Sequence, residues 1–243
     1  MASNHSTFDT TKLLAVCERH PYQGSDVVVP EPYVPYLPKT PSGWNGILVV
    51  AIAQNLSDTN RSYRDWLEAL EPTDRWNRLR IDSSPVSGIG IGPWDDGTIK
   101  LCVAALRGVE AIGQVAVSNA VLWSGRQSGM NESLSEGAKA ASVSVWREML
   151  EVMNPTEVVT FGAVAREVMK RTGVSKRGLA DMPGPFSRNY NVSFRMDVDR
   201  LLSAFPEVAR AWKSLSGHVQ VDNEAMAIHC ACACVSRELS RSR

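Results

Sequence analysis

The feature that most constrains the fold is an unbroken apolar run, Ile47 to Ala53, that ends in polar residues. Such a run, rich in β-branched side chains, is typical of a strand buried on both faces, because a half-exposed strand alternates apolar and polar residues. Gln114 to Val121 and Glu157 to Phe161 have the same character. Strands of this kind belong to parallel sheets that helices cover on both sides.

Helical spacing of apolar residues predicts the elements between and after these strands. It indicates helices from Ser57 or Asp58 to about Leu70, near residues 139–153, from Ala163 to about Arg171, and near residues 197–214. Strands that alternate with helices predict an α/β protein. We expect a three-layer α/β/α sandwich around a mostly parallel four-stranded sheet.

Residues 44–215 are expected to form this α/β domain, with residues 216–243 packing on it as a C-terminal segment. Prolines recur from Pro21 to Pro41 too often for a helix. Residues 1–43 are therefore expected to form an irregular, Pro-rich arm, of which the segment Pro30 to Pro41 packs extended across the surface.

Composition narrows the class of protein. The chain of 243 residues carries 26 basic and 26 acidic side chains, so no overall positive charge announces nucleic acid, although a local basic rim is enough to contact a few phosphates. No apolar run is long enough to span a bilayer, and Met1 to Thr11 lacks the apolar stretch of a secretory signal. We expect a soluble cytoplasmic protein with reduced thiols and no membrane partner.

Cys230, Cys232 and Cys234 alternate with alanines near the C-terminus. On a strand the three would share one face, where they could ligate a metal, but zinc sites prefer wider spacing between paired cysteines. We interpret the segment as a buried Cys/Ala strand and expect no metal and no cofactor.

The ends of the predicted strands indicate where to look for a functional site. In parallel α/β sheets ligands bind beyond the carboxyl ends of the strands. The residues at those ends are Gln54, Asn55 and Ser57 after the first strand, Asn119 in the second, Gly162 after the third, and the residues directly after a fourth.

At these strand ends the sequence resembles the uracil-DNA glycosylase superfamily. Ala53-Gln54-Asn55-Leu56-Ser57 occupies the place of its first motif, Gly-Gln-Asp-Pro-Tyr, in which some branches carry Asn instead of Asp. Val117-Ser118-Asn119-Ala120-Val121-Leu122 matches a strand that ends in a base-reading Asn. Trp146 through Pro155 to Phe161-Gly162-Ala163 follows the superfamily's helix–Pro–strand–Gly pattern.

The fourth motif of the superfamily, His-Pro-Ser-Pro followed by an apolar wedge, resembles Met182-Pro183-Gly184-Pro185-Phe186-Ser187. Order and spacing agree over roughly residues 47–190. The main departure is Met182, which stands where the superfamily has a His that stabilises negative charge on the departing base. A thioether cannot donate that hydrogen bond. Leu56 also replaces a Pro, and the glycines that follow the first motif are missing.

The resemblance implies roles for individual residues. Asn55 would position the attacking water, Gln54 would contact a base oxygen through its backbone amide, and Asn119 would read the edge of the base, with Ser57 and Tyr63 also at the base. The DNA-binding residues would be Met182, Pro183, Gly184, Pro185, Phe186, Ser187 and Arg188. Phe186 would fill the gap left by a flipped base, and Ser187 and Arg188 would hold phosphates.

Single residues also have ordinary structural interpretations. Asn55 can be a turn residue, Asn119 can satisfy a buried backbone group, and the Pro-Gly segment can be a plain turn. Trp44, Tyr63 and Trp66 can stack on a base, although helical spacing favours core packing for Trp66.

The resemblance implies a monofunctional DNA glycosylase that hydrolyses the N-glycosidic bond of a damaged or modified pyrimidine and leaves an abasic site. The base would be uracil, or a bulky one such as the hydroxymethylated or glucosylated cytosine of phage DNA, which would suit DNA repair or phage defence. The partner would be DNA with a flipped nucleotide, with no obligate protein partner.

Met182 favours an alternative function, that of a catalytically silent superfamily member that binds nucleobases or single-stranded DNA. A nucleotide enzyme, suggested by the glycines of residues 88–92, is a third possibility.

Overall fold

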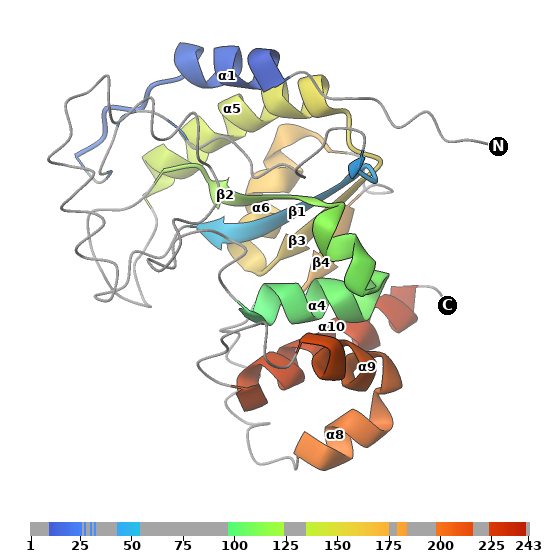
Figure 1. The fold of residues 1–243 in the computed structure, drawn as a ribbon. Coiled ribbons are helices and arrows are strands. Elements are labelled where there is room, and N and C mark those ends of the chain that lie inside the picture. The colour runs from blue at the N-terminus through green and yellow to red at the C-terminus, as the bar shows by residue number, and fades with distance from the viewer. Residues whose placement is uncertain are drawn as a thin grey trace, which may run out of the picture.

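The described residues form an α/β fold around one parallel sheet, as a computed structural model shows (Figure 1). The structure describes residues 10–25, 27, 30, 32, 43–53, 97–123, 135–174, 179–183, 198–215 and 224–241. The sheet has four strands in the order β2-β1-β3-β4. They are β1 (Ile47–Ala53), β2 (Ala116–Val121), β3 (Glu157–Phe161) and β4 (Leu179–Met182), and every neighbouring pair is parallel.

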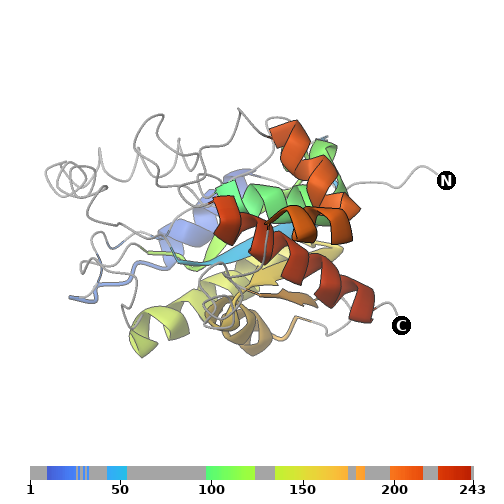
Figure 2. The same ribbon diagram turned by 90° about the horizontal axis from the view of Figure 1, so that it is seen from below.

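Helices cover both faces of the sheet, as predicted (Figures 1 and 2). One face carries α1 (Thr10–Arg19), α5 (Glu136–Met153) and α6 (Ala163–Thr172). The opposite face carries α4 (Gly97–Arg107), α8 (Val198–Ala204), α9 (Pro206–Leu215) and α10 (Glu224–Arg241), while the 3-10 helix η3 (Val109–Gly113) leads from α4 into β2. This arrangement confirms the α/β class and the layered architecture.

The strands are apolar on both sides because each face has its own core. Side chains alternate along β1, so that Val49 packs with α4 and α10, while Leu48 and Val50 pack with α1, α5 and α6. The side chains of β1 are buried in both cores, since Leu48 and Val50 are 0% exposed and Val49 is 1% exposed. The unbroken run in the sequence therefore reflects burial from both sides.

The termini of α5 follow from local chemistry. The Ser135 hydroxyl caps the first turn by accepting a hydrogen bond of 3.0 Å from the amide of Ala138, so the helix begins at Glu136, three residues earlier than predicted. Asn154 ends it in the left-handed conformation with φ 49°. Trp146 anchors the helix to the sheet, since its indole nitrogen donates to the carbonyl of Ala120 at 3.1 Å.

The N-terminal arm contains a helix, which corrects the prediction that residues 1–43 are irregular. Helix α1 ends at Arg19, before the first proline of the arm, Pro21, so the prolines do not oppose it. Leu13, Val16 and Cys17 are buried in the core that α1 shares with α5. Sequence reasoning extended the proline-rich character too far towards the N-terminus.

The predicted helix near residues 197–214 is two helices, α8 and α9. Pro206 has no amide hydrogen to continue α8, and its fixed backbone suits the first position of a new helix. Leu201 and Val208, one in each helix, are both buried in the same core. The prediction of helical structure from the apolar spacing is therefore confirmed, while the prediction of one continuous helix is wrong.

The C-terminal cysteines lie on a helix, so the prediction of a Cys/Ala strand is wrong. Alternation of Cys and Ala resembles a period of two, yet the residues buried against the core also fit a helical stripe. That stripe runs through Ala227, Cys230, Ala231, Cys234 and Val235. Alanine has the highest helix propensity, which favours this outcome.

Helix α4 was not predicted, and it fills the face of the sheet next to α10. The predicted helix from Ser57 or Asp58 to Leu70 lies outside the described residues. Among the helices that the structure describes, none is both long and apolar enough to cross a membrane.

Candidate active site

The carboxyl ends of the four strands meet at one edge of the sheet, where the sequence placed the site. Asn119 pairs with Ala51, and Phe161 pairs with Met182. Because Val50 lies opposite Thr160, the next residues, Ala51 and Phe161, extend the same row. One row across the sheet therefore runs from Asn119 through Ala51 and Phe161 to Met182.

The connections of the sheet define a switch point at this edge. The chain leaves β1 for β2 through α4 on one face, and leaves β3 for β4 through α6 on the opposite face. The two connections diverge, and in open α/β sheets ligands bind beyond the strand ends where this happens. Gly162 follows β3 directly with φ 91°, and Asn55 is the second residue after Ala53 in the sequence.

Asn119 lies inside β2, whereas the resemblance predicts that this Asn ends the strand. The strand continues to Val121, which pairs with Ala53, so Asn119 is two residues below the edge. Its side chain is 6% exposed and, by alternation with Val117, is on the face that α4 covers. No hydrogen bond connects that side chain to another residue of the described ranges. The side chain is therefore buried below the carboxyl ends of the strands.

Met182 is the last residue of β4, and its side chain is 4% exposed within the core. Its carbonyl accepts a hydrogen bond of 3.0 Å from the amide of Gly162, which joins the ends of β3 and β4. Pro183 comes next and is half-buried. The thioether is therefore buried in the core at the end of β4, while the direct DNA contact of Met182 and Pro183 stays a prediction.

Most of the predicted site residues lie outside the residues that the structure describes. They are Gln54, Asn55, Ser57, Tyr63, Gly184, Pro185, Phe186, Ser187 and Arg188. Trp66 and the glycines of residues 88–92 also lie there.

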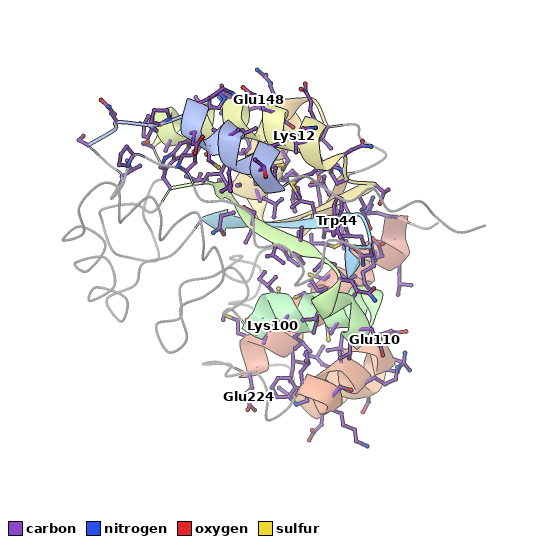
Figure 3. All side chains as sticks on the ribbon, turned by 45° about the horizontal axis from the view of Figure 1, so that its top comes forward. Lys12, Trp44, Lys100, Glu110, Glu148 and Glu224 are labelled. Carbon is purple, nitrogen blue, oxygen red and sulfur yellow. The ribbon has the colours of Figure 1, made fainter. Side chains whose placement is uncertain are left out.

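Trp44 belongs to the core and not to the site. It precedes β1, at the opposite edge of the sheet from the candidate site (Figure 3). Its side chain is 2% exposed, and the indole nitrogen donates to the carbonyl of Ile47 at 2.9 Å. Trp44 therefore packs in the core, and the structure gives no support to its stacking on a base.

Sequence reasoning missed that the N-terminal arm is fastened beside the end of β2. The carbonyl of Pro30 accepts a hydrogen bond from the Tyr22 amide at 2.7 Å and another from the Trp123 indole nitrogen at 2.9 Å. The rings of Tyr22 and Trp123 pack with their centres 5.4 Å apart. Trp123 is the second residue after β2, so this part of the arm lies beside the carboxyl end of β2. The aromatic residue Trp123, two positions after a buried strand, was the only sequence signal for this.

A second missed feature is a fixed carboxylate on β4. Asp181 precedes Met182 and accepts a hydrogen bond of 2.9 Å from the Thr160 hydroxyl on β3. Its other oxygen lies 3.3 Å from the Lys170 ammonium on α6. These contacts hold the end of β4 against β3 and α6, on the face opposite to the side chain of Met182.

Comparison with known protein families finds no family model that matches the chain, and comparison with curated proteins finds no match.

Proposed function

We propose that this protein is a monofunctional DNA glycosylase that hydrolyses the N-glycosidic bond of a modified pyrimidine. The observation that carries the proposal is the order of the strand ends. The motif that contains Asn55 follows β1, the motif that contains Asn119 lies at the end of β2, and Met182 begins the fourth motif at the end of β4. The switch point lies where β1 and β3 end, and Asn55 follows β1 in the sequence, which supports Asn55 independently of any resemblance.

Hydrolysis of the N-glycosidic bond by these residues would depend on the positioning of water and base more than on proton transfer. The amide oxygen of Asn55 can orient a water molecule towards the sugar but cannot take up a full proton. Asn119 offers one donor and one acceptor group, which complements the hydrogen-bonding edge of uracil or, with the amide reversed, of cytosine. The burial of Asn119 strengthens such hydrogen bonds, since water competes less there.

The substitution at Met182 limits the substrate. Without a donor at this position the departing base loses a stabilising hydrogen bond, and removal of one such preorganised donor commonly lowers the rate about a hundredfold or more. A modified pyrimidine that leaves more readily than uracil, or a larger one that gains binding contacts, would offset this loss. A modified pyrimidine of phage DNA, and with it a role in phage defence, is the substrate class that we favour.

A second candidate function is binding without cleavage, and the same residue favours it. Met182 fills the core at the end of β4 and has no proton to donate. A member of this kind would hold a flipped base or a single strand without releasing the base.

A base-release assay with the purified chain tests the proposal. Oligonucleotides that carry uracil, hydroxymethyluracil, hydroxymethylcytosine or glucosylated hydroxymethylcytosine are incubated with the protein and then treated with alkali, which breaks the strand at abasic sites. We expect breaks at one base type, and none with Asn55→Ala. Gln114→Ala is the matched control, because it removes an exposed amide at the opposite edge of the sheet and should retain full activity.

The outcomes separate the two functions. Equal activity of Asn55→Ala and the wild type would remove Asn55 from the mechanism. An absence of breaks on every substrate, together with retarded migration of a labelled single strand in a gel, would replace the glycosylase with the silent binder.

A further inference from the structure

Three buried cysteines from two helices meet at the end of β4. Cys102 on α4 and Cys230 and Cys234 on α10 are each 0% exposed. Their three sulfur atoms all lie within 4.8 Å of one another, and those of Cys102 and Cys230 are 3.6 Å apart. All three are thiols rather than halves of disulfides.

The helices create this cluster through their spacing. Cys230 and Cys234 are four residues apart, so they lie on the same face of α10, and this face packs against α4. Cys232 lies between them in sequence but points in another direction and is not part of the cluster. Alanines flank the cysteines on α10.

The spacing of the sulfurs matches that around a bound metal ion. With zinc–sulfur bonds of about 2.3 Å, two sulfurs on one ion lie about 3.8 Å apart in a tetrahedron and about 4.0 Å apart in a planar triangle. The observed separations, 3.6 Å for one pair and none above 4.8 Å, bracket these values. The three sulfurs are therefore close enough to share one ion.

We propose that Cys102, Cys230 and Cys234 bind one divalent thiophilic metal ion of the Zn²⁺ class. Thiolates prefer soft or borderline ions such as Zn²⁺ and Cu⁺ over hard ions such as Mg²⁺. Burial penalises net charge, and three thiolates leave one negative charge on a divalent ion but two on a monovalent ion. Binding exchanges the protons of the three thiols for three metal–sulfur bonds, without any change of oxidation state.

The surroundings offer a further oxygen. The carbonyl of Pro183 lies 3.9 Å from the sulfurs of both Cys230 and Cys234. Pro183 directly follows β4, so the ion would hold α4, α10 and the start of the predicted Met182–Phe186 motif together. Its role would be structural, and the inference does not depend on the proposed function.

Titration of the reduced, chelator-treated full chain with Zn²⁺ in the absence of oxygen tests the site. We expect one ion per chain, and with Cd²⁺ as the probe an ultraviolet charge-transfer band from thiolate to metal. Cys102→Ala, Cys230→Ala and Cys234→Ala should each weaken binding at least tenfold. Cys17→Ala and Cys232→Ala are matched controls, since both residues are buried cysteines outside the cluster, and they should bind as the wild type does.

A measurement on the wild type keeps the test decisive if a variant fails to fold. In mild denaturant, Zn²⁺ should slow alkylation of Cys102, Cys230 and Cys234 at least tenfold more than that of Cys17 and Cys232, as mass spectrometry of the peptides would show; stabilisation of the fold alone would slow all five equally. Absence of binding by the wild type, or equal weakening in the control variants, would overturn the proposal. So would recovery of a Cys102–Cys230 disulfide from freshly purified protein, which would indicate a redox pair instead.

Discussion

Asn119 on β2 and Met182 on β4 lie in the same row of residues across the sheet, although β2 and β4 are its two outermost strands. Both side chains are on the face that α4 and α10 cover. Three strand spacings of about 4.8 Å separate them, which places the two residues about 14 Å apart. They therefore cannot act on the same atom of a ligand. Asn119 would hold one end of the site, while the end of β4 sets the starting point of the segment that contains Phe186.

Met182 is expected to act as a core residue. Met182→Leu conserves volume and should change the free energy of unfolding by less than about 1.5 kcal/mol, while Met182→Ala leaves a cavity and should cost about 2–5 kcal/mol. Base release by Met182→Leu should stay close to that of the wild type. Denaturant unfolding and the alkali assay measure the two effects. A stable Met182→Leu protein with release lowered more than tenfold would show instead that the thioether contacts the substrate.

Asn119→Ala is expected to affect the substrate more than the fold. Loss of a paired hydrogen-bonding contact to a base is worth about 1–3 kcal/mol, which corresponds to a fall of about 5- to 150-fold in kcat/KM. Ser118→Ala is the control, because Ser118 is the buried neighbour that points to the other face. If both variants lower kcat/KM equally, Asn119 does not read the base.

Phe186→Ala tests the predicted wedge. Only duplex DNA has a stack to refill after a base flips out, so activity should fall far more on duplex than on single-stranded substrate. The ratio of the two rates, measured on one sequence in both forms, is the readout. An equal fall on both forms contradicts the wedge assignment.

Gly46→Ala should destabilise the protein at the start of β1. Gly46 has φ 85°, and an added Cβ would lie 2.6 Å from the Thr156 hydroxyl oxygen. A left-handed backbone alone costs an alanine about 1–2 kcal/mol, and the displaced hydroxyl adds to this, since it donates to the Gly46 carbonyl at 3.2 Å. Gly113→Ala is the control, because its Cβ would meet nothing within 4 Å. Thermal unfolding should separate the two variants, and an equal effect would argue against strain at Gly46.

Glu148 is expected to make stability depend on pH. A hydrogen bond from Arg19, followed by one from His20, lowers the pKa of Glu148 on α5 below its ordinary value. A lowered pKa in the folded state means that this stabilisation is present above the unfolded pKa and is lost as the pH falls through the folded pKa. Because Glu148 is 38% exposed, the effect should be only about 0.5 kcal/mol at neutral pH.

The comparison of Glu148→Gln with Glu151→Gln isolates this effect, since Glu151 is exposed on the same helix. Denaturant unfolding from neutral to acidic pH should show a difference between Glu148→Gln and the wild type that disappears as carboxylates become protonated. A difference that is constant across the whole range would mean that the carboxylate charge is not its cause.

Several elements could be predicted from the sequence because their signals are local. The bounds of β1 and β3 agree with the structure to the residue, since an unbroken β-branched run between polar residues has one interpretation. The sequence around the cysteines of α10 had two interpretations. Residues 230, 232 and 234 fit one face of a strand, while residues 230 and 234 also fit one face of a helix. Alanine propensity favours the helix weakly, and the packing of α10 on α4 decides for it.

The sequence by itself determined the class of fold and the place of the candidate site, because buried strands that alternate with helices force a parallel sheet, and a parallel sheet brings its carboxyl ends to one edge. The tertiary structure decided how deep each residue lies. Strand register placed Asn119 two residues below that edge and Met182 in its row, and helix packing brought Cys102 to Cys230 across 128 positions of the chain. Contacts between residues so distant in sequence depend on how whole elements pack, and no local pattern carries that information.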